Sequence, residues 1–237
     1  MIEFKIVNEF RLFIVRGISI CLITAIPGTI LLALYFFTSP MIAEYHEIKL
    51  KKSVLEIFDI PYHTEVKKIL GFKYEKIDKE DIRDIFDESI TIETLSSRYV
   101  AGQPKDKEGR KLFKYFKDRK LQGIGFVVTK FGYGFNKAAD ISLFICVGPD
   151  LETIKGIETL DHSETPGLGG RMTEEEFKKQ FIGKKLKPKI SFVRGKETVG
   201  SNEVHAITGA SYTSKGMEKI INEAMETFWK EMGANRG

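Results

Sequence analysis

A long stretch without charge near the N-terminus constrains the fold of this chain more than any other feature. Residues Gly17 to Thr38 include neither an acidic nor a basic side chain. About 20 apolar residues suffice to cross a bilayer as a helix, which satisfies its own backbone polar groups. A secretory signal has a shorter apolar core, of about 7 to 15 residues, and a small-x-small cleavage site, neither of which is clear here. The sequence therefore predicts one transmembrane helix at residues 17–38.

Basic residues are distributed unevenly around this span. Lys5, Arg11 and Arg16 precede it closely, whereas the next Lys or Arg after it is Lys49. Cytoplasmic loops carry an excess of Lys and Arg, so this pattern favours a cytoplasmic N-terminus at residues 1–16. The rest of the chain is then expected on the extracytoplasmic side of an inner or plasma membrane.

The segment after the span, residues 39–110, is predicted to be a helical region that holds the remaining chain away from the bilayer. Apolar residues spaced among Glu and Lys predict an amphipathic helix that continues from the membrane and ends at Pro61. They are Ile42, Ile48, Val54, Leu55 and Phe58. A short helix is predicted at Asp78–Ser89, with its apolar residues Ile82, Ile85 and Phe86 facing inward. The stretch Gln103–Arg110 combines Pro and Gly with charged residues and is predicted to be a loop.

A cluster of hydroxyl residues lies directly before the most regular helical pattern in the chain. The segment T-G-A-S-Y-T-S runs from Thr208 to Ser214. From Lys215 onward, apolar residues recur every three or four positions, at Met217, Ile220, Ile221, Ala224, Met225, Phe228 and Met232. Ser, Thr and Gly satisfy the unpaired N–H groups at a helix start, and the same groups attract a phosphate. The cluster is compatible with simple capping, but capping needs one hydroxyl, so a phosphate site is also predicted.

A second motif has the composition of a ligand-binding loop. The segment H-S-E-T-P-G-L-G-G, from His162 to Gly170, combines a carboxylate and a hydroxyl with a Pro-Gly turn and two further glycines. Glycine is used where a ligand approaches the main chain or where φ is positive. Between the two motifs, T-E-E-E-F-K-K-Q-F predicts a helix capped by Thr173, with Glu176 completing a capping box.

Composition excludes some functions and leaves one alternative for the two motifs. Acidic and basic residues nearly balance, with a net charge of +4, and the lysines are scattered, so nucleic acid is not indicated as a partner. Cys21 lies in the span and Cys146 in an apolar run, so a disulfide between them is not expected. His162, His205 and Glu164 are a conceivable set of metal ligands. A phosphate-bearing cofactor explains the glycines and hydroxyls better, so no metal is predicted.

Taken in order, these motifs resemble the FMN-binding domain family. The order is G-Y-G at Gly132–Gly134, an apolar strand, K-G-I, E-T-P-G-L-G, F-x-G-K and T-G-A-S-x-T-S. The family includes the FMN-bearing subunits of the Na⁺-translocating NADH:quinone oxidoreductase and of the Rnf electron transport complex. The resemblance covers the chain from about Leu112 onward, and a weaker similarity that begins at Ala43 favours the quinone-reductase subunit over the Rnf one.

The resemblance implies an α+β fold, a flavin-binding domain of antiparallel strands and helices at residues 111–237, on one N-terminal transmembrane helix. Two runs rich in Val, Ile and Phe, Gly123–Thr129 and Ile141–Val147, agree with it because their composition predicts strands.

The family also implies where the cofactor binds. Its members carry FMN joined by a phosphoester bond to the hydroxyl in the fourth position of (S/T)-G-A-(T/S), which is Ser211 here. The residues that would line the phosphate are Thr208, Gly209, Ala210 and Thr213. The residues that would contact the flavin are Glu164, Thr165, Gly167, Leu168 and Gly169. This chain departs from the family at two positions, because the acceptor is usually Thr and His205 replaces an Asp six residues before it. Thr208 and Thr213 are alternative acceptors, and FMN held without a covalent bond is the alternative mode of binding.

The function implied by the resemblance is electron relay by FMN within a membrane oxidoreductase complex, without turnover of a substrate by this chain alone. The implied partners are the other subunits of that complex, a flavin transferase and membrane lipid. The basic stretch Lys178–Lys189 is interpreted as a solvated turn, with lipid headgroups or an acidic partner as alternatives. Two other functions stay open: a free-standing extracytoplasmic FMN carrier, and an anchored binding domain that has lost the flavin.

Overall fold

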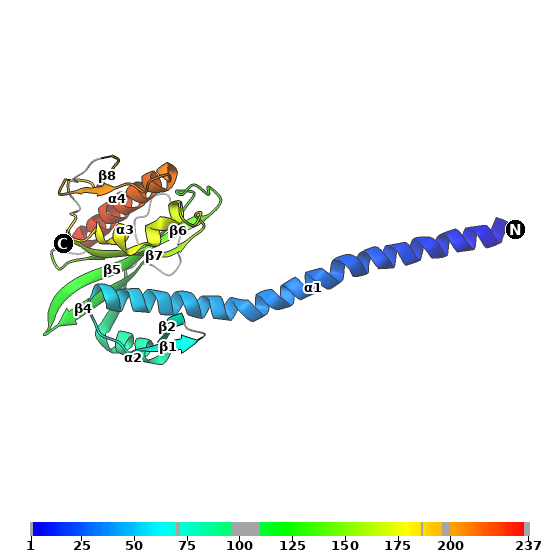
Figure 1. Ribbon diagram of the computed structural model, residues 1–237, viewed down its shortest axis with the longest axis horizontal. Coiled ribbons are helices and arrows are strands. Elements are labelled where there is room, and N and C mark those ends of the chain that lie inside the picture. Colours follow the sequence, from blue (N-terminus) through cyan, green and yellow to red (C-terminus); the bar gives the residue numbers. More distant parts are fainter. Residues whose placement is uncertain (1, 70–71, 96–109, 186, 196–199, 235–237) are drawn as a thin grey trace. The chain divides into compact units, whose positions relative to one another are not determined.

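The computed structural model describes residues 2–69, 72–95, 110–185, 187–195 and 200–234. The chain divides into two units, Met1–Glu47 and Ile48–Gly237. The first unit is helical, and the second is an antiparallel sheet with helices on both faces (Figure 1). The loop predicted at Gln103–Arg110 lies outside the described residues, except for Arg110, which begins a strand.

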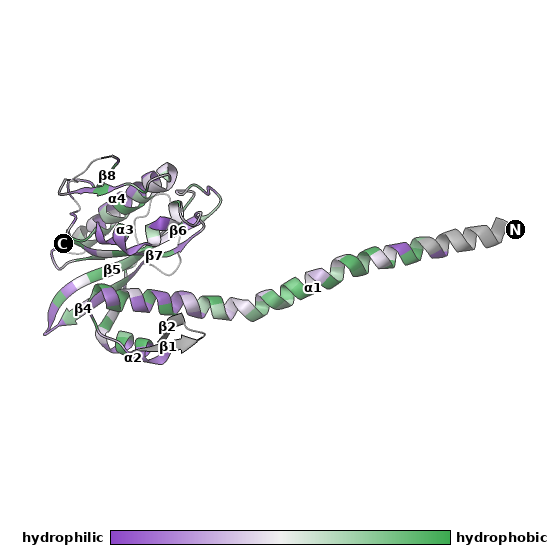
Figure 2. Cartoon of the chain, in the orientation of Figure 1, coloured by the Kyte–Doolittle hydropathy of each residue, from purple (hydrophilic) through white to green (hydrophobic). Residues whose placement is uncertain are grey.

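The charge-free stretch lies within helix α1 (Ile2–Ile57). Large apolar side chains from Phe13 to Tyr45 are exposed. In Figure 2 the middle of α1 is coloured mainly as hydrophobic. Four hydroxyls in this part donate to carbonyl oxygens one turn earlier: Ser19, Thr24, Thr29 and Thr38. These polar groups are thus satisfied without water. By its length and composition, α1 can cross a membrane.

The last turns of α1 belong to the second unit and contribute to its core. Val54 and Leu55 are fully buried there, which confirms the amphipathic helix predicted after the span. The helix ends at Ile57, and Asp59 then adopts a φ of 54°, outside the helical range. The predicted end at Pro61 is therefore wrong by about one turn, because the chain already reverses at Asp59.

Five antiparallel strands form the sheet in the order of the sequence. They are β3 (Ile90–Leu95), β4 (Arg110–Lys117), β5 (Lys120–Phe131), β6 (Asp140–Val147) and β7 (Ile154–His162). The predicted strands Gly123–Thr129 and Ile141–Val147 are confirmed as parts of β5 and β6. Because β3 pairs with β4, part of the predicted membrane-proximal region belongs to the same sheet as the domain expected from residue 111. The boundary at that residue stays a prediction.

Helices cover both faces of the sheet. One face carries the 3₁₀ helix η1 (Gly169–Thr173), α3 (Glu175–Lys179) and α4 (Ser211–Ala234), and the other carries the end of α1 and α2 (Lys79–Ser89). The carboxylate of Asp78 accepts hydrogen bonds from two N–H groups in the first turn of α2, as a helix cap does. Helix α2 buries Ile82 and Phe86, as its sequence pattern predicted.

Strand β6 shows why helices must cover both faces of the sheet. Leu143, Ile145 and Val147 belong to the core beneath α4, whereas Phe144 and Cys146 belong to the core that includes the end of α1 and α2. Successive side chains of a strand point to opposite faces, so a continuous apolar run makes two hydrophobic surfaces. The α+β class with antiparallel strands is confirmed.

Two smaller pairs of strands complete the second unit. The hairpin of β1 (Thr64–Ile69) and β2 (Phe72–Ile77) precedes α2. Strands β8 (Ser191–Val193) and β9 (Glu203–His205) pair in parallel between α3 and α4.

One helix start differs from the sequence prediction. Helix α3 begins after Glu174, and no side chain caps it. Thr173 instead ends η1, and its hydroxyl donates to the carbonyl oxygen of Gly170 at 3.0 Å. The predicted cap at Thr173 and the capping box with Glu176 are wrong, because that hydroxyl closes the tight turn after the glycine-rich loop.

Candidate functional site

Helix α4 begins at Ser211, within the hydroxyl cluster, and Ser214 organises its start. The Ser214 hydroxyl accepts a hydrogen bond from the N–H of Ile207 at 3.0 Å and donates to the carbonyl oxygen of Ala210 at 2.8 Å. Gly209 has a φ of 80°, a conformation that favours glycine. One buried hydroxyl thus closes the turn before the helix, and the other hydroxyls of the cluster are left for other roles.

The first turn of α4 presents hydrogen-bond donors that the protein does not use. Among the described residues, the N–H groups of Ser211, Tyr212 and Thr213 have no acceptor, as is usual at a helix start. The hydroxyls of Thr208 and Ser211 also have no hydrogen-bond partner in that part of the chain. Unpaired N–H groups, the positive end of the helix dipole and free hydroxyls together favour a phosphate group.

Glu164, from the loop after β7, is buried directly against this turn. Its carboxylate accepts hydrogen bonds from the Thr213 hydroxyl at 2.5 Å, from the N–H of Phe135 at 2.8 Å and from the N–H of Asn136 at 3.3 Å. The residue is 7% exposed. The structure therefore joins the two motifs singled out in the sequence and adds a third segment, the loop between β5 and β6.

Two glycines make room for that carboxylate. A Cβ atom on Gly134 would lie 2.1 Å from Oε1 of Glu164, and one on Gly169 would lie 2.3 Å from Oε2. Close packing leaves no space for either atom unless the carboxylate moves. Gly167 differs, because its surroundings are open and its φ of 74° is what favours glycine.

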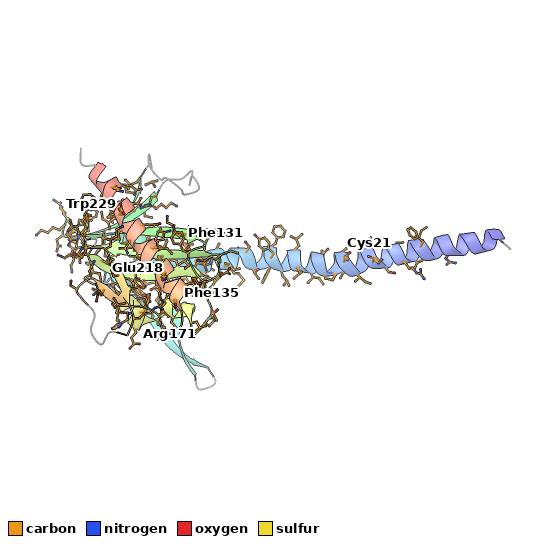
Figure 3. All side chains as sticks on the ribbon, turned by 90° about the horizontal axis from the view of Figure 1, so that it is seen from above. Cys21, Phe131, Phe135, Arg171, Glu218 and Trp229 are labelled. Carbon is orange, nitrogen blue, oxygen red and sulfur yellow. The ribbon has the colours of Figure 1, made fainter. Side chains whose placement is uncertain are left out.

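Exposed apolar side chains surround the first turn of α4. The rings of Phe135 and Tyr212 are 66% and 63% exposed, with centroids 6.2 Å apart. Leu168 is also exposed, and its Cδ2 would lie 3.3 Å from a Cβ atom on Gly209. We call Phe135, Tyr212 and Leu168 the apolar rim. Figure 3 shows Phe135 close to the start of α4. A planar ring system can be held by such side chains.

The remaining residues of the predicted site occupy different environments. Thr165 is exposed, and its carbonyl oxygen accepts hydrogen bonds from the N–H groups of Leu168 and Gly170. The Thr213 hydroxyl is buried and already donates to Glu164, so only the backbone N–H of Thr213 is left for a ligand. This arrangement favours Ser211 over Thr213 as the hydroxyl presented to a phosphate.

The two histidines considered as metal ligands have other contacts. Nδ1 of His162 accepts a hydrogen bond from the N–H of Glu164 at 3.1 Å. His205 is exposed at the end of β9, and its N–H donates to Oε1 of Gln180 at 2.6 Å. The described residues include no group of three or more His, Cys, Asp or Glu side chains that could hold a metal ion.

The segment that contains these features matches a known family. Residues 134–226 match the FMN-binding domain. This segment is an FMN-binding domain. It spans Gly134, the Glu164 loop and the first turn of α4, and FMN is its cofactor.

The FMN-binding domain is similar to components of two ion-translocating complexes. The chain is 34% identical over 105 residues to NqrC of the Na(+)-translocating NADH-quinone reductase of Yersinia pestis, a match that covers 41% of this chain and 37% of that protein. It is 28% identical over 150 residues to RnfG of the ion-translocating oxidoreductase complex of Methanosarcina acetivorans, a match that covers 62% of this chain and 73% of that protein. The chain thus matches little more than a third of the length of the first relative.

Its fold is similar to that of a solved structure. The crystal structure of Shewanella oneidensis NqrC aligns with a TM-score of 0.58 and 24% sequence identity, over 81% of this chain and 99% of that chain. The likeness extends to the arrangement of the sheet and helices and supports the fold assignment.

The residues around the first turn of α4 fit FMN. The free N–H groups and hydroxyls suit its phosphate, and the apolar rim suits a flat ring. Phe135 was not predicted as a site residue, although its aromatic side chain directly after the G-Y-G turn was a signal for it. The role of the β5–β6 loop was also not predicted. N–H groups of this loop donate to the same Glu164 carboxylate that accepts a hydrogen bond from α4.

Proposed function

We propose that this chain is a membrane-anchored flavoprotein that carries FMN on Ser211 and relays electrons within a membrane oxidoreductase complex. The complex is of the Na⁺-translocating NADH:quinone reductase type or the Rnf type, as the similarity to NqrC and RnfG supports. The observation that carries the proposal is the Ser211 hydroxyl, which has no hydrogen-bond partner among the described residues. It lies at a helix start whose first N–H groups have no acceptor among those residues either.

The residues of the first turn have distinct roles in this proposal. The N–H groups of Ser211, Tyr212 and Thr213 would hold the phosphate, and the dipole of α4 would stabilise its charge. The Ser211 hydroxyl would form the phosphoester bond: it would lose its proton and take the FMN phosphoryl group from a flavin donor that carries a phosphoanhydride bond. That bond would break, and its other phosphate would leave, in a reaction that a flavin transferase catalyses. Gly209 lets the backbone turn tightly before the phosphate, since its φ is positive. FMN supplies the electron chemistry when it is bound.

The apolar rim has a second role. Phe135, Tyr212 and Leu168 offer the flavin ring an apolar surface beside the phosphate site. Lys137, whose Nζ lies 5.9 Å from the centroid of the Tyr212 ring, adds positive charge there. Positive charge near a flavin stabilises its reduced form. These side chains therefore orient the ring and influence its potential.

The proposed location is the extracytoplasmic side of an inner or plasma membrane, with α1 as the single anchor. The basic residues before the span support this orientation. A covalent tether has a clear purpose on that side, because a lost FMN could not be replaced from the cytosol. Fusion of a reporter that is active only outside the cytoplasm to the C-terminus tests the orientation, and activity of a cytoplasmic reporter at the same position would contradict it.

Intact-mass measurement of the full chain tests the attachment. The chain is expressed with and without a flavin transferase, denatured, weighed and examined for flavin fluorescence in a gel. Wild type is expected to gain the mass of FMN less one water only when the transferase is present. Ser211→Ala is expected to lose this gain, and Ser211→Thr to keep it, because threonine supplies the same hydroxyl.

Thr208→Val is the matched control, since it removes another hydroxyl of the cluster that has no hydrogen-bond partner among the described residues. It is expected to keep the added mass. Loss of the mass in Thr208→Val with retention in Ser211→Ala would move the acceptor to Thr208. A wild type that is yellow in its folded state but gains no mass would show FMN held without a covalent bond. A colourless wild type would favour an anchored binding domain without flavin.

A further inference from the structure

Glu164 was expected to contact the flavin, but its carboxylate is fully engaged with the protein. Oε2 accepts from the Thr213 hydroxyl at 2.5 Å, and Oε1 accepts from the N–H groups of Phe135 and Asn136. All three donors are from outside the loop that carries Glu164. A buried carboxylate must keep its hydrogen bonds, because each lost partner leaves an unsatisfied charge.

The surroundings of Glu164 show that this arrangement is built for the carboxylate. Gly134 and Gly169 stand where a Cβ atom would overlap its two oxygens. The backbone of Glu164 is also held, because its N–H donates to Nδ1 of His162 at 3.1 Å. The side chain therefore has one position, and its oxygens face protein donors.

The three donors connect the two ends of the candidate FMN site. Thr213 lies in the first turn of α4, two residues after Ser211, so its position sets where the phosphate end lies. Phe135 contributes the ring that lies beside Tyr212 in the apolar rim. One carboxylate thus ties the helix start to the β5–β6 loop, which bears Phe135 of the rim.

We propose that Glu164 is a positioning residue and not a flavin ligand. It holds the start of α4 and the β5–β6 loop in a fixed relation, and so sets the orientation of the flavin between the phosphate end and the apolar rim. This inference rests on the proposed FMN site at Ser211.

Three variants separate positioning from direct contact. Glu164→Gln keeps the length of the side chain: its amide oxygen can accept from Phe135 and Asn136, and its NH₂ can donate to the Thr213 hydroxyl. Glu164→Ala removes all three hydrogen bonds of the carboxylate. Thr213→Val removes only the hydrogen bond to α4 and keeps the side-chain volume nearly constant. Glu174→Ala is the matched control, because Glu174 is an exposed acid near the same loop.

The measurements are FMN content and circular dichroism in the visible flavin band, made on the full chain in detergent after expression with a flavin transferase. The flavin band reports how the protein holds the ring, independently of electron-transfer activity. Glu164→Gln and Glu174→Ala are expected to match wild type. Glu164→Ala and Thr213→Val are expected to change the band in the same way. The variant with both substitutions is expected to change it no more than either substitution alone, because each breaks the same connection between α4 and the β5–β6 loop.

Two results would overturn the inference. If Glu164→Gln changes the band as much as Glu164→Ala while Thr213→Val leaves it unchanged, the carboxylate acts directly on the flavin. If the variants lower thermal stability but leave FMN content and the band of the bound flavin unchanged, Glu164 has only a structural role. Should Glu164→Ala fail to fold, Thr213→Val and Glu164→Gln still decide between these outcomes. A wild type without FMN would instead refute the proposed function.

Discussion

Gly216 of α4 lies so close to Tyr133 that a Cβ atom on the glycine would be 2.0 Å from the Tyr133 carbonyl oxygen. The Tyr133 hydroxyl also donates to Oε2 of Glu223 on the same helix, at 3.0 Å. The β5–β6 loop, which carries Phe135 of the apolar rim, is therefore seated on α4 through a close backbone approach at one point and a side-chain hydrogen bond at another.

We expect Gly216→Ala to destabilise the protein despite the higher helix propensity of alanine. In a free helix the change would stabilise by about 1 kcal/mol, but here the added methyl meets backbone that cannot rotate away. Overpacking of this kind costs about 1 to 3 kcal/mol. Thermal unfolding followed by circular dichroism measures the change, with the exposed Lys230→Ala in the same helix as control. A raised melting temperature for Gly216→Ala would show that the loop is not held by this contact.

Tyr212→Leu is expected to raise the fluorescence of FMN bound at Ser211. Tyr212 directly follows Ser211, the proposed acceptor, and is exposed in the apolar rim. An electron-rich phenol close to an excited flavin quenches its emission. Trp229→Leu is the control, because this exposed residue of α4 lies 17 positions further along, about 26 Å at 1.5 Å per residue. Emission of the folded proteins is compared at equal FMN content. Equal emission from wild type and Tyr212→Leu would place the flavin ring away from Tyr212.

His162 makes the stability of the domain depend on pH. Burial, and secondarily the nearby Lys49, lower the pKa of His162 below its usual 6.5, although Glu164 and Asp161 oppose this shift. The lowered pKa means that the folded state favours the neutral ring, whose Nδ1 accepts from the N–H of Glu164. The resulting stability is complete above about pH 6.5 and is lost as the pH falls from there through the lower pKa of the folded state.

Thermal unfolding of wild type and His162→Gln between pH 7.5 and 5 checks this effect. Glutamine can accept the same hydrogen bond through its carbonyl oxygen but does not titrate. The melting temperature of wild type is expected to fall more steeply over this range than that of the variant. Identical slopes would mean that His162 has the same pKa in the folded and unfolded chain.

Cys146 is expected to resist alkylation in the folded protein. Its side chain is fully buried in β6, and burial raises the pKa of its thiol to about 12. At pH 8 roughly one thiol in ten thousand would then be ionised, and the thiolate is the reactive form. Peptide mapping after treatment with iodoacetamide should find Cys146 unmodified in the native chain and modified in concentrated urea. Rapid labelling of the native chain would show that β6 opens readily.

The sequence by itself determined the features that depend on local pattern. The run from Gly17 to Thr38 has no charge and is long enough to cross a bilayer, so a helix follows from length and composition. The strand at Ile141–Val147 and the helix after Ser211 follow from apolar periodicity, and the order of the motifs was enough to identify FMN as the cofactor.

Only the tertiary structure decided how the hydroxyls and the carboxylate of the site are used. Ser214 closes the turn before α4, Thr213 is bound to Glu164, and the Ser211 hydroxyl has no partner within the described part of the chain, although all three hydroxyls look equivalent in the sequence. Their partners come from segments far away along the chain, and the Phe135 loop joins them only when β5, β7 and α4 assemble. A hydrogen bond is set by the distance and direction between two groups, and no local pattern of residues specifies either for groups so distant in sequence.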